Sequence, residues 1–459
     1  MTILIFIGVL TAFVSKEQLK KTLRQLPNYF WIIFLCILLL AFISTLFSSS
    51  PFYGAVEISL LLMVIWVALI TAHVTQNYYY GKYMVVSAAC IVVFLYVLKF
   101  SIGYTFFMSG YESFPLWPAS GIKGGITGFV NIRFFNQVQA FTLPLLIGGG
   151  LVMMPKKRTA GIFCFLLTVI WWMLLIQSAG RGIMLSSLSA ALVSLFFLKK
   201  HIHRWIWYFL GTLLLGYLLK VILFDIIPID TSSAKSMVRG GSPRLTLWPQ
   251  TFFSSLEQPI FGHGPMSFAQ IHTGFTPSHP HNSILQLLYE LGYPATIGVL
   301  IVAGMGFKTW ILQTKKNLKV KSDILDDTAI IKVSLTTSVL AGLCYSLVSG
   351  VIVMPLSQLW LALVFGTVLG LYNKGKSEQD IYISINTFYV YASKLFIIIA
   401  AIVLASVLIR DIPTLRENEK RFVKETDRHV FRPRFWQQGK IGFEKLDTIE
   451  LKQTEKSNL

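Results

Sequence analysis

The residue best suited to acid–base chemistry is His281, which together with Asn282 opens the apolar run Ser-Ile-Leu-Gln-Leu-Leu. A helix that starts there would hold the imidazole beside its positive end, which disfavours the protonated form. A neutral imidazole can accept a proton from an alcohol at about pH 7. We therefore predict that His281 is catalytic. The alternative is a structural role, in which His281 caps the helix.

Two arginines stand in settings that suit an anionic ligand. Arg181 lies between Gly180 and Gly182, and Arg244 follows a Gly-Gly-Ser-Pro run that could open a helix. Glycine leaves the backbone open to a ligand, and the first turn of a helix favours an anion. The pair therefore predicts a clamp for a phosphate or diphosphate. The alternatives are snorkelling of Arg181 to the membrane interface and ordinary solvation of a loop arginine.

Other polar residues beside these positions are candidates for substrate binding. They are Arg133, Asn136, Gln137, Gln139, Arg239 and Asn282. The amides at 136–139 stand at the predicted outer start of a membrane span, where they could bond sugar or phosphate oxygens. They could equally cap that helix and pack between helices.

Zinc binding is the competing chemistry, because His272, His279 and His281 lie close together in the sequence. No HxxxH pair accompanies them, and the four cysteines lie in apolar runs without CxxC spacing. We therefore predict no metal and no other cofactor.

The elements that must position these residues are membrane helices. The chain is 54% hydrophobic and 13% charged, whereas charged residues make up roughly 25% of soluble domains. We predict an all-α polytopic membrane protein with about twelve transmembrane helices, each near the length that crosses the hydrocarbon core. The predicted spans are Ile3 to Val14, Tyr29 to Phe47, Ala55 to Val74, Met84 to Tyr104, Gln137 to Met154, Ala160 to Ser178, Gly182 to Leu198, Trp205 to Phe224, Leu291 to Leu312, Ala329 to Val353, Leu356 to Tyr372 and Lys394 to Ile409.

Basic residues orient these spans. Clusters at 16–24, 156–158, 199–204, 315–321 and 374–376 fall on every second crossing. By the positive-inside rule these loops face the cytoplasm, and the large polar loop at 225–290 faces the opposite side. The net charge of +19 is therefore attributed to topology, and no nucleic-acid partner is expected.

These boundaries divide the chain into four parts. We predict N-terminal membrane helices at 1–130, a catalytic core at 131–312 that contains the loop at 225–290, C-terminal membrane helices at 313–409, and a charged tail at 410–459. The tail mixes both charge signs, which favours a solvated helix with charge pairs.

The order of these motifs resembles a known superfamily. A GRG between two spans is followed by PRLTLW, LEQPIFGHGPMSF and HPHNSILQLLYELGYP. This order is similar to that of the O-antigen ligase and O-antigen polymerase superfamily, which includes bacterial protein O-oligosaccharyltransferases, over Phe134 to about Ala303. The resemblance implies a GT-C-like, metal-independent, inverting glycosyltransferase of the bacterial inner membrane, with its active site facing the periplasm.

The resemblance also implies substrates and residue roles. The donor would be a glycan on undecaprenyl diphosphate, and the acceptor a hydroxyl, with lipid A-core as the first choice. Arg181 and Arg244 would hold the diphosphate, and His281 would take the acceptor proton. An O-antigen polymerase or a protein O-oligosaccharyltransferase is the alternative, with the same donor and another acceptor. A transporter of an anionic lipid-linked substrate is a remoter one, because it predicts an internal repeat that the sequence does not show.

Overall fold

The computed structural model describes residues 28–109, 132–226, 244–270, 277–319, 326–374 and 387–426. Helices dominate, and no β-strand occurs in these ranges. The long helices are α3 (Asn28–Leu46), α4 (Pro51–Asn77), α5 (Met84–Met108), α6 (Ile132–Met153), α7 (Arg158–Gln177), α8 (Arg181–Leu198), α9 (His203–Lys220), α11 (Arg244–Ser255), α12 (Ser283–Lys319), α13 (Asp327–Ser346), α14 (Pro355–Lys374) and α15 (Thr387–Thr426). Short 3-10 or π turns lie at Tyr79–Tyr83, Lys199–Ile202, Val221–Ile226 and Ser267–Ala269.

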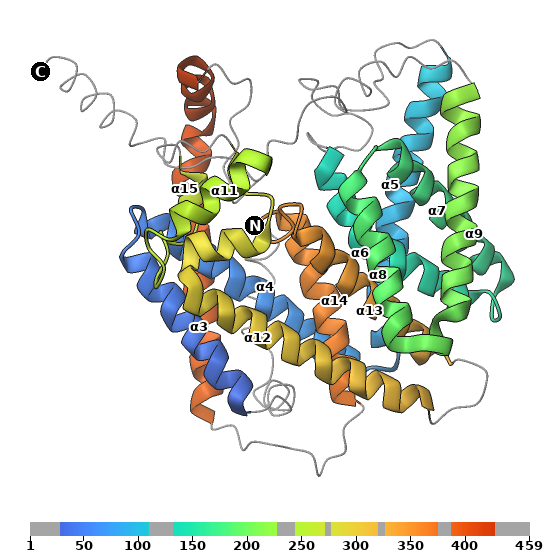
Figure 1. The fold of residues 1–459 in the computed structure, drawn as a ribbon, viewed down its shortest axis with the longest axis horizontal. Helices are drawn as coiled ribbons and strands as arrows, with labels where there is room; N and C mark the ends of the chain where they lie inside the picture. The colour runs from blue at the N-terminus through green and yellow to red at the C-terminus, as the bar shows by residue number, and fades with distance from the viewer. Residues whose placement is uncertain are drawn as a thin grey trace, which may run out of the picture.

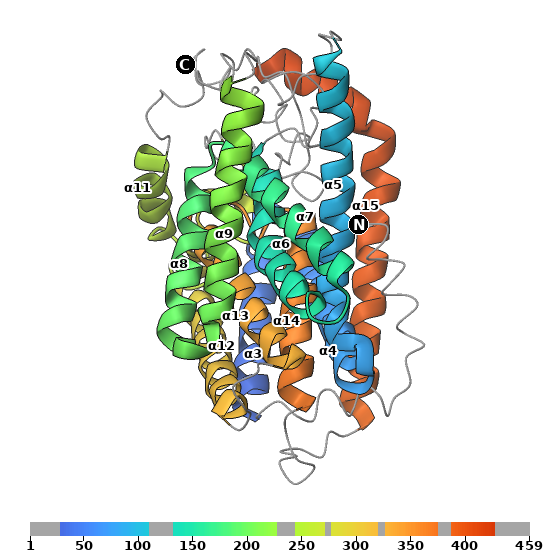
Figure 2. The same ribbon diagram turned by 90° about the vertical axis from the view of Figure 1, so that its right-hand side faces the viewer.

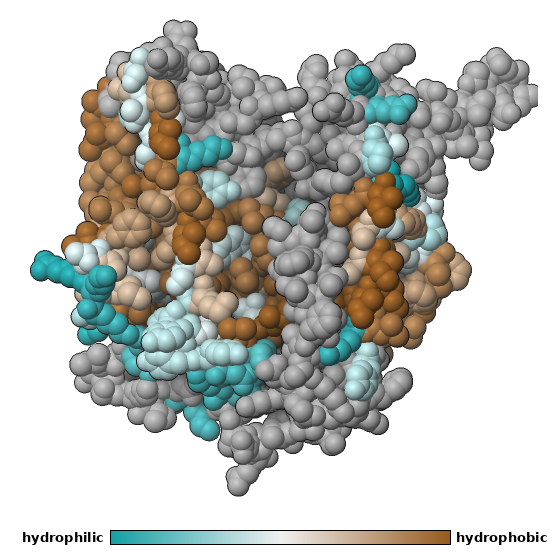
Figure 3. Space-filling model, turned by 180° about the vertical axis from the view of Figure 1, so that it is seen from behind, coloured by the Kyte–Doolittle hydropathy of each residue, from teal (hydrophilic) through white to brown (hydrophobic). Residues whose placement is uncertain are grey.

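The fold is that of a polytopic all-α membrane protein, as predicted. Ten helices in the described ranges are long and apolar enough to cross a bilayer. Their outer faces carry exposed apolar stripes, such as Leu185, Leu192 and Phe196 at 65, 66 and 74% exposure on α8. Figure 3 shows broad apolar areas on one face of the molecule, with hydrophilic residues mostly gathered below them. The predicted span Ile3 to Val14 lies outside the described residues.

Helix α6 forms the centre of the bundle and is not one of these ten. Its first half carries Asn136, Gln137 and Gln139, and almost all of its residues are buried. Gly148 allows α13 to approach closely, because a Cβ there would lie 2.3 Å from Ser334 Oγ. On the other side, the edge of the Trp171 ring of α7 contacts Phe135 at 4.9 Å between ring centroids. Close packing of small residues is how membrane helices associate without a hydrophobic driving force.

Helix α12 is kinked at Gly292, whose φ is +78°. The break frees carbonyl groups in the preceding turn, and a buried carbonyl without a partner is costly in a membrane. The loop after α11 supplies the donors: His263 N–H bonds Tyr289 O at 2.8 Å and Gly264 N–H bonds Glu290 O at 3.0 Å. This docking fixes the loop against the first half of α12.

The two ends of the bundle are formed by different helix termini. Figures 1 and 2 place α11 with the C-terminal ends of α5, α9 and α15 at one end, and the C-terminal ends of α12 and α14 at the other.

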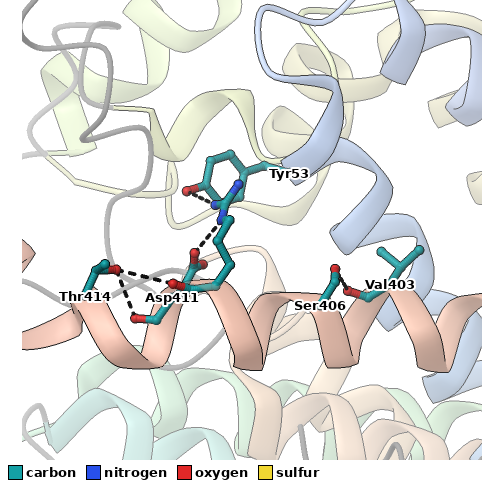
Figure 4. Close-up of polar contacts among 6 residues, drawn as sticks. Tyr53, Val403, Ser406, Asp411 and Thr414 are labelled. Carbon is teal, nitrogen blue, oxygen red and sulfur yellow. Dashed lines mark hydrogen bonds and ion pairs between the residues drawn. The ribbon is translucent and has the colours of Figure 1, made fainter.

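Helix α15 continues past its candidate span, Ser393–Asp411, to Thr426. It is tied to the start of α4, where Arg410 Nη2 donates to Tyr53 OH at 2.7 Å and the guanidinium lies 4.2 Å from the Phe52 ring centroid. Figure 4 shows Tyr53 facing α15 beside Asp411.

Candidate active site

Four helices begin at the same end of the bundle, and each brings a candidate residue. Arg133, Arg181 and Arg244 stand in the first turns of α6, α8 and α11, and His281 precedes α12. Asn136 Nδ2 donates to Ser178 Oγ at 2.9 Å, which holds the start of α6 beside the turn before α8. Ser283 Oγ donates to Ser346 O at 3.0 Å, which joins the start of α12 to the end of α13.

Arginines are electrostatically unfavourable at these positions. The N-terminal end of a helix carries a positive partial charge, so a cation there loses about 0.3–1 kcal/mol that an anion would gain. Stability alone therefore does not account for arginines in three neighbouring first turns. An anionic ligand would be bound both by the guanidinium groups and by the free backbone N–H groups of the helices.

Arg133 and Arg244 act on each other and on Tyr345 of α13. Burial and then the charge of Arg133 lower the pKa of Arg244, while Tyr345 opposes this shift. Tyr345 is buried, and its ring also lies beside α8, where a Cβ on Gly182 would be 3.3 Å from Tyr345 Cε2. We call Arg133, Arg244 and Tyr345 the arginine cluster.

His281 belongs with this cluster. Burial, then the charges of Arg133 and Arg244, lower the pKa of His281 to about 3. The imidazole is therefore neutral at physiological pH, because of its burial and the two arginine charges. Its φ of +57° lies in the left-handed region, which costs a non-glycine residue about 1–2 kcal/mol. The neighbouring turn is held by Trp248 Nε1, which donates to Pro280 O at 2.9 Å.

Asn282, not His281, caps α12. Its Oδ1 accepts the backbone N–H groups of Ile284 and Leu285 at 3.0 and 3.1 Å. Because Asn282 satisfies these donors, the imidazole of His281 is not needed as a cap. This geometry disfavours the structural alternative for His281 and gives Asn282 a role within the protein.

The three amides of α6 bond to protein atoms. Gln137 Nε2 donates to Ser349 Oγ at 2.9 Å, and Gln139 Nε2 donates to Trp171 O at 3.1 Å. Asn136 Nδ2 also reaches Gln139 Oε1 at 2.9 Å, and all three residues are at most 1% exposed. These contacts match the alternative in which the amides join helices beneath the site.

Arg133 and Arg181 are exposed, so a ligand can reach both, whereas Arg244 is partly buried. Arg181 lies next to the cluster through its neighbour Gly182, where a Cβ would be 3.3 Å from Tyr345 Cε2. The predicted contributors Arg239 and His272 lie outside the described residues.

Metal ligands do not gather in the described part of the chain. No group of three or more His, Cys, Asp or Glu side chains there is placed to hold an ion. All four cysteines are free. The two histidines of the zinc alternative, His279 and His281, contact each other with ring centroids 4.1 Å apart, in an edge-to-face arrangement.

Two members of the site carried no usable signal in the sequence. Tyr345 lies inside the predicted span Ala329 to Val353, far from the other motifs in the sequence. The sequence suggests only zinc binding for His279, whereas the structure shows its ring in contact with His281.

Fold and site together define a polytopic all-α membrane protein with a cationic cluster and a neutral histidine at one end of its bundle. Residues 159–300 match a family model described as O-antigen ligase. Over this segment the chain is therefore similar to the O-antigen ligase family, which confirms the resemblance seen in its motifs. The match includes Arg181, Arg244 and His281, while Arg133 and Tyr345 flank it. No curated protein matches the chain.

Proposed function

We propose that this protein transfers a glycan from undecaprenyl diphosphate to an acceptor hydroxyl, with lipid A-core as the acceptor. The observation that carries the proposal is the neutral His281 beside Arg133 and Arg244, with His281 and Arg244 inside the segment that matches the family model. We place the enzyme in the bacterial inner membrane with this site on the periplasmic side, on the basis of the alternating basic loops.

The reaction is an inverting displacement. The acceptor oxygen bonds to the anomeric carbon while the bond from that carbon to the phosphate oxygen breaks. The proton of the hydroxyl passes to His281, and undecaprenyl diphosphate leaves with the electron pair. Arg133, Arg181 and Arg244 stabilise the negative charge that develops on the leaving group. Two or three fixed guanidinium groups supply the charge that a divalent cation supplies in metal-dependent transferases.

A base with a pKa of about 3 is too weak to accept this proton. The bound diphosphate makes His281 a stronger base, because negative charge beside the imidazole favours its protonated form and raises its pKa. His281 therefore becomes an effective base when the donor is bound.

The test is a transfer assay with full-length protein in lipid nanodiscs, a lipid-linked glycan and separate acceptors. Glycan on lipid A-core, retained in the presence of a chelator, supports the proposal. Glycan found only on a growing glycan or only on a protein acceptor would assign the polymerase or protein O-oligosaccharyltransferase reaction instead. His281→Ala should abolish transfer without lowering protein level; full activity in that variant would remove His281 from the mechanism.

A further inference from the structure

His279 forms a side-chain turn that ends at His281. Its Nδ1 accepts the backbone N–H of His281 at 3.2 Å. Asparagine and aspartate make the same contact in Asx turns, where the side-chain oxygen bonds the N–H two residues on. Because a backbone N–H can only donate, His279 Nδ1 must carry no proton. A neutral His279 therefore has its proton on Nε2.

The ring of His279 is itself held firmly. It is 4% exposed and lies against Gly350, in the turn between α13 and α14. A Cβ on Gly350 would be 2.5 Å from His279 Cε1 and 2.8 Å from Nε2, so only glycine leaves room for the ring. The far side of the turn is fixed by the bond from Trp248 Nε1 to Pro280 O.

His281 needs such support for two reasons. Its φ of +57° is one that a histidine adopts only when its surroundings impose it. Its imidazole is also held next to the charges of Arg133 and Arg244, which disfavour the protonated, positively charged form of the ring. The contact at 4.1 Å between the two ring centroids sets the position of the His281 ring as well as its backbone.

We propose that His279 is the positioning residue for His281: its Nδ1 fixes the left-handed turn, and its ring holds the His281 imidazole toward the arginine cluster. This inference rests on the proposed role of His281 in proton transfer. It also explains why the two histidines lie two apart, which is the spacing of an Asx-type turn. The Nδ1 lone pair of His279 is used by this bond and does not face a ligand.

The experiment compares His279→Asn with His279→Leu in the nanodisc assay. Asparagine keeps an acceptor where Nδ1 stands, whereas leucine keeps bulk and loses the acceptor. We expect His279→Leu to lower kcat about 10- to 100-fold, because a misplacement of a reacting group by about 1 Å can cost about 100-fold, with the donor KM changed less than about threefold. His279→Asn should recover kcat to within about threefold of the natural protein. Equal losses in both variants, or full kcat in His279→Leu, would overturn the inference.

A second variant tests the same contact from the other side. Gly350→Ala should lower kcat in the natural background, because its methyl group displaces the His279 ring. In the His279→Asn background the loss should shrink, since Cε1 and Nε2, which make the closest contacts, are gone. Losses that simply multiply would count against the positioning role.

A matched control is His263→Leu. His263 is another histidine of this loop, stacked on Tyr289 at 4.3 Å between ring centroids and bonded to Ser254 O at 2.9 Å. We expect it to lower the melting temperature while kcat stays within about twofold. The outcome for His281→Ala separates the two proposals. Full activity there overturns the proposed role of His281 in proton transfer, whereas an inactive His281→Ala beside a fully active His279→Leu overturns only the inference about His279.

Discussion

Arg133 provides the sharpest test of the site, because its importance emerges from the structure rather than from a motif. We predict that Arg133→Gln has two separate effects on donor turnover. It removes a guanidinium group from the proposed diphosphate clamp. It also removes a positive charge that lowers the pKa of His281, and Arg133 has a larger effect on that pKa than Arg244 has.

The first effect can be given a size. A hydrogen bond to a charged group contributes about 1.5–3 kcal/mol, and each 1.36 kcal/mol is tenfold in rate. We therefore expect kcat/KM for the donor to fall about 10- to 150-fold. Arg133→Lys should recover only part of this loss, because an ammonium group does not bind a phosphate in the bidentate manner of arginine.

The second effect has a definite sign. Removing a positive charge favours the protonated imidazole, so the pKa of His281 rises from about 3. It stays below the ordinary value because burial, the largest cause of the shift, remains. The pH profile of kcat/KM reports the free enzyme, so its acidic limb should move to higher pH in Arg133→Gln.

The assay is the initial rate of glycan transfer at varied donor concentration and pH. Arg158→Gln is a matched control, because Arg158 also begins a helix, α7, but at the opposite end of the bundle from Arg133. Activity near that of the natural protein in Arg133→Gln would refute the clamp. A loss of activity with an unmoved acidic limb would refute the electrostatic contact between Arg133 and His281.

Three further predictions address stability and orientation. The pKa of His281 is depressed in the folded state, so its contribution to stability is complete above about pH 6.5 and declines as pH falls toward 3. His281→Gln should therefore flatten the dependence of melting temperature on pH in this window. Gly264→Ala should lower the melting temperature by several degrees, because φ is +98° and the new Cβ would lie 2.3 Å from Ser48 Cβ; an unchanged value would show that the loop is not docked as described. A membrane-impermeant maleimide should label Gln250→Cys on α11 in spheroplasts but not Lys316→Cys on α12. The reverse pattern would invert the proposed topology.

Much of the fold could be predicted because apolar runs of membrane length leave few alternatives to helices. The start of α11 at Arg244 and the start of α12 just after Asn282 also follow from local signals. The span predicted from Leu291 begins too late, because the helix that starts at Ser283 and the apolar run after Leu291 form one helix, α12. The chain does kink at Gly292, yet α12 continues on both sides of it, since the docked loop satisfies the carbonyls that the kink frees.

The grouping of the site could not be predicted in the same way. Which arginine meets His281 depends on how α6, α11 and α12 pack, and the sequence contains no pairing signal between those helices. From the sequence, Arg133 is therefore one of several possible substrate ligands, whereas the glycine neighbours of Arg181 favour a place in the anion clamp. The roles of Asn136, Gln137 and Gln139 depend on partners from α7, the turn after it and the turn after α13, which are all distant from α6 in the sequence.

The electrostatics of the site explain how donor binding and proton transfer could be coupled. Without an anion, burial and the charges of Arg133 and Arg244 keep the imidazole of His281 neutral, with little affinity for a second proton. A diphosphate brings negative charge to the same place, which both satisfies the guanidinium groups and raises the basicity of the histidine. In the proposed reaction, more negative charge develops on the leaving group beside the newly formed imidazolium, so the two charges stabilise each other. In the proposed reaction, His281 is a weak base for an acceptor that binds before the donor and a stronger base for an acceptor that binds after it.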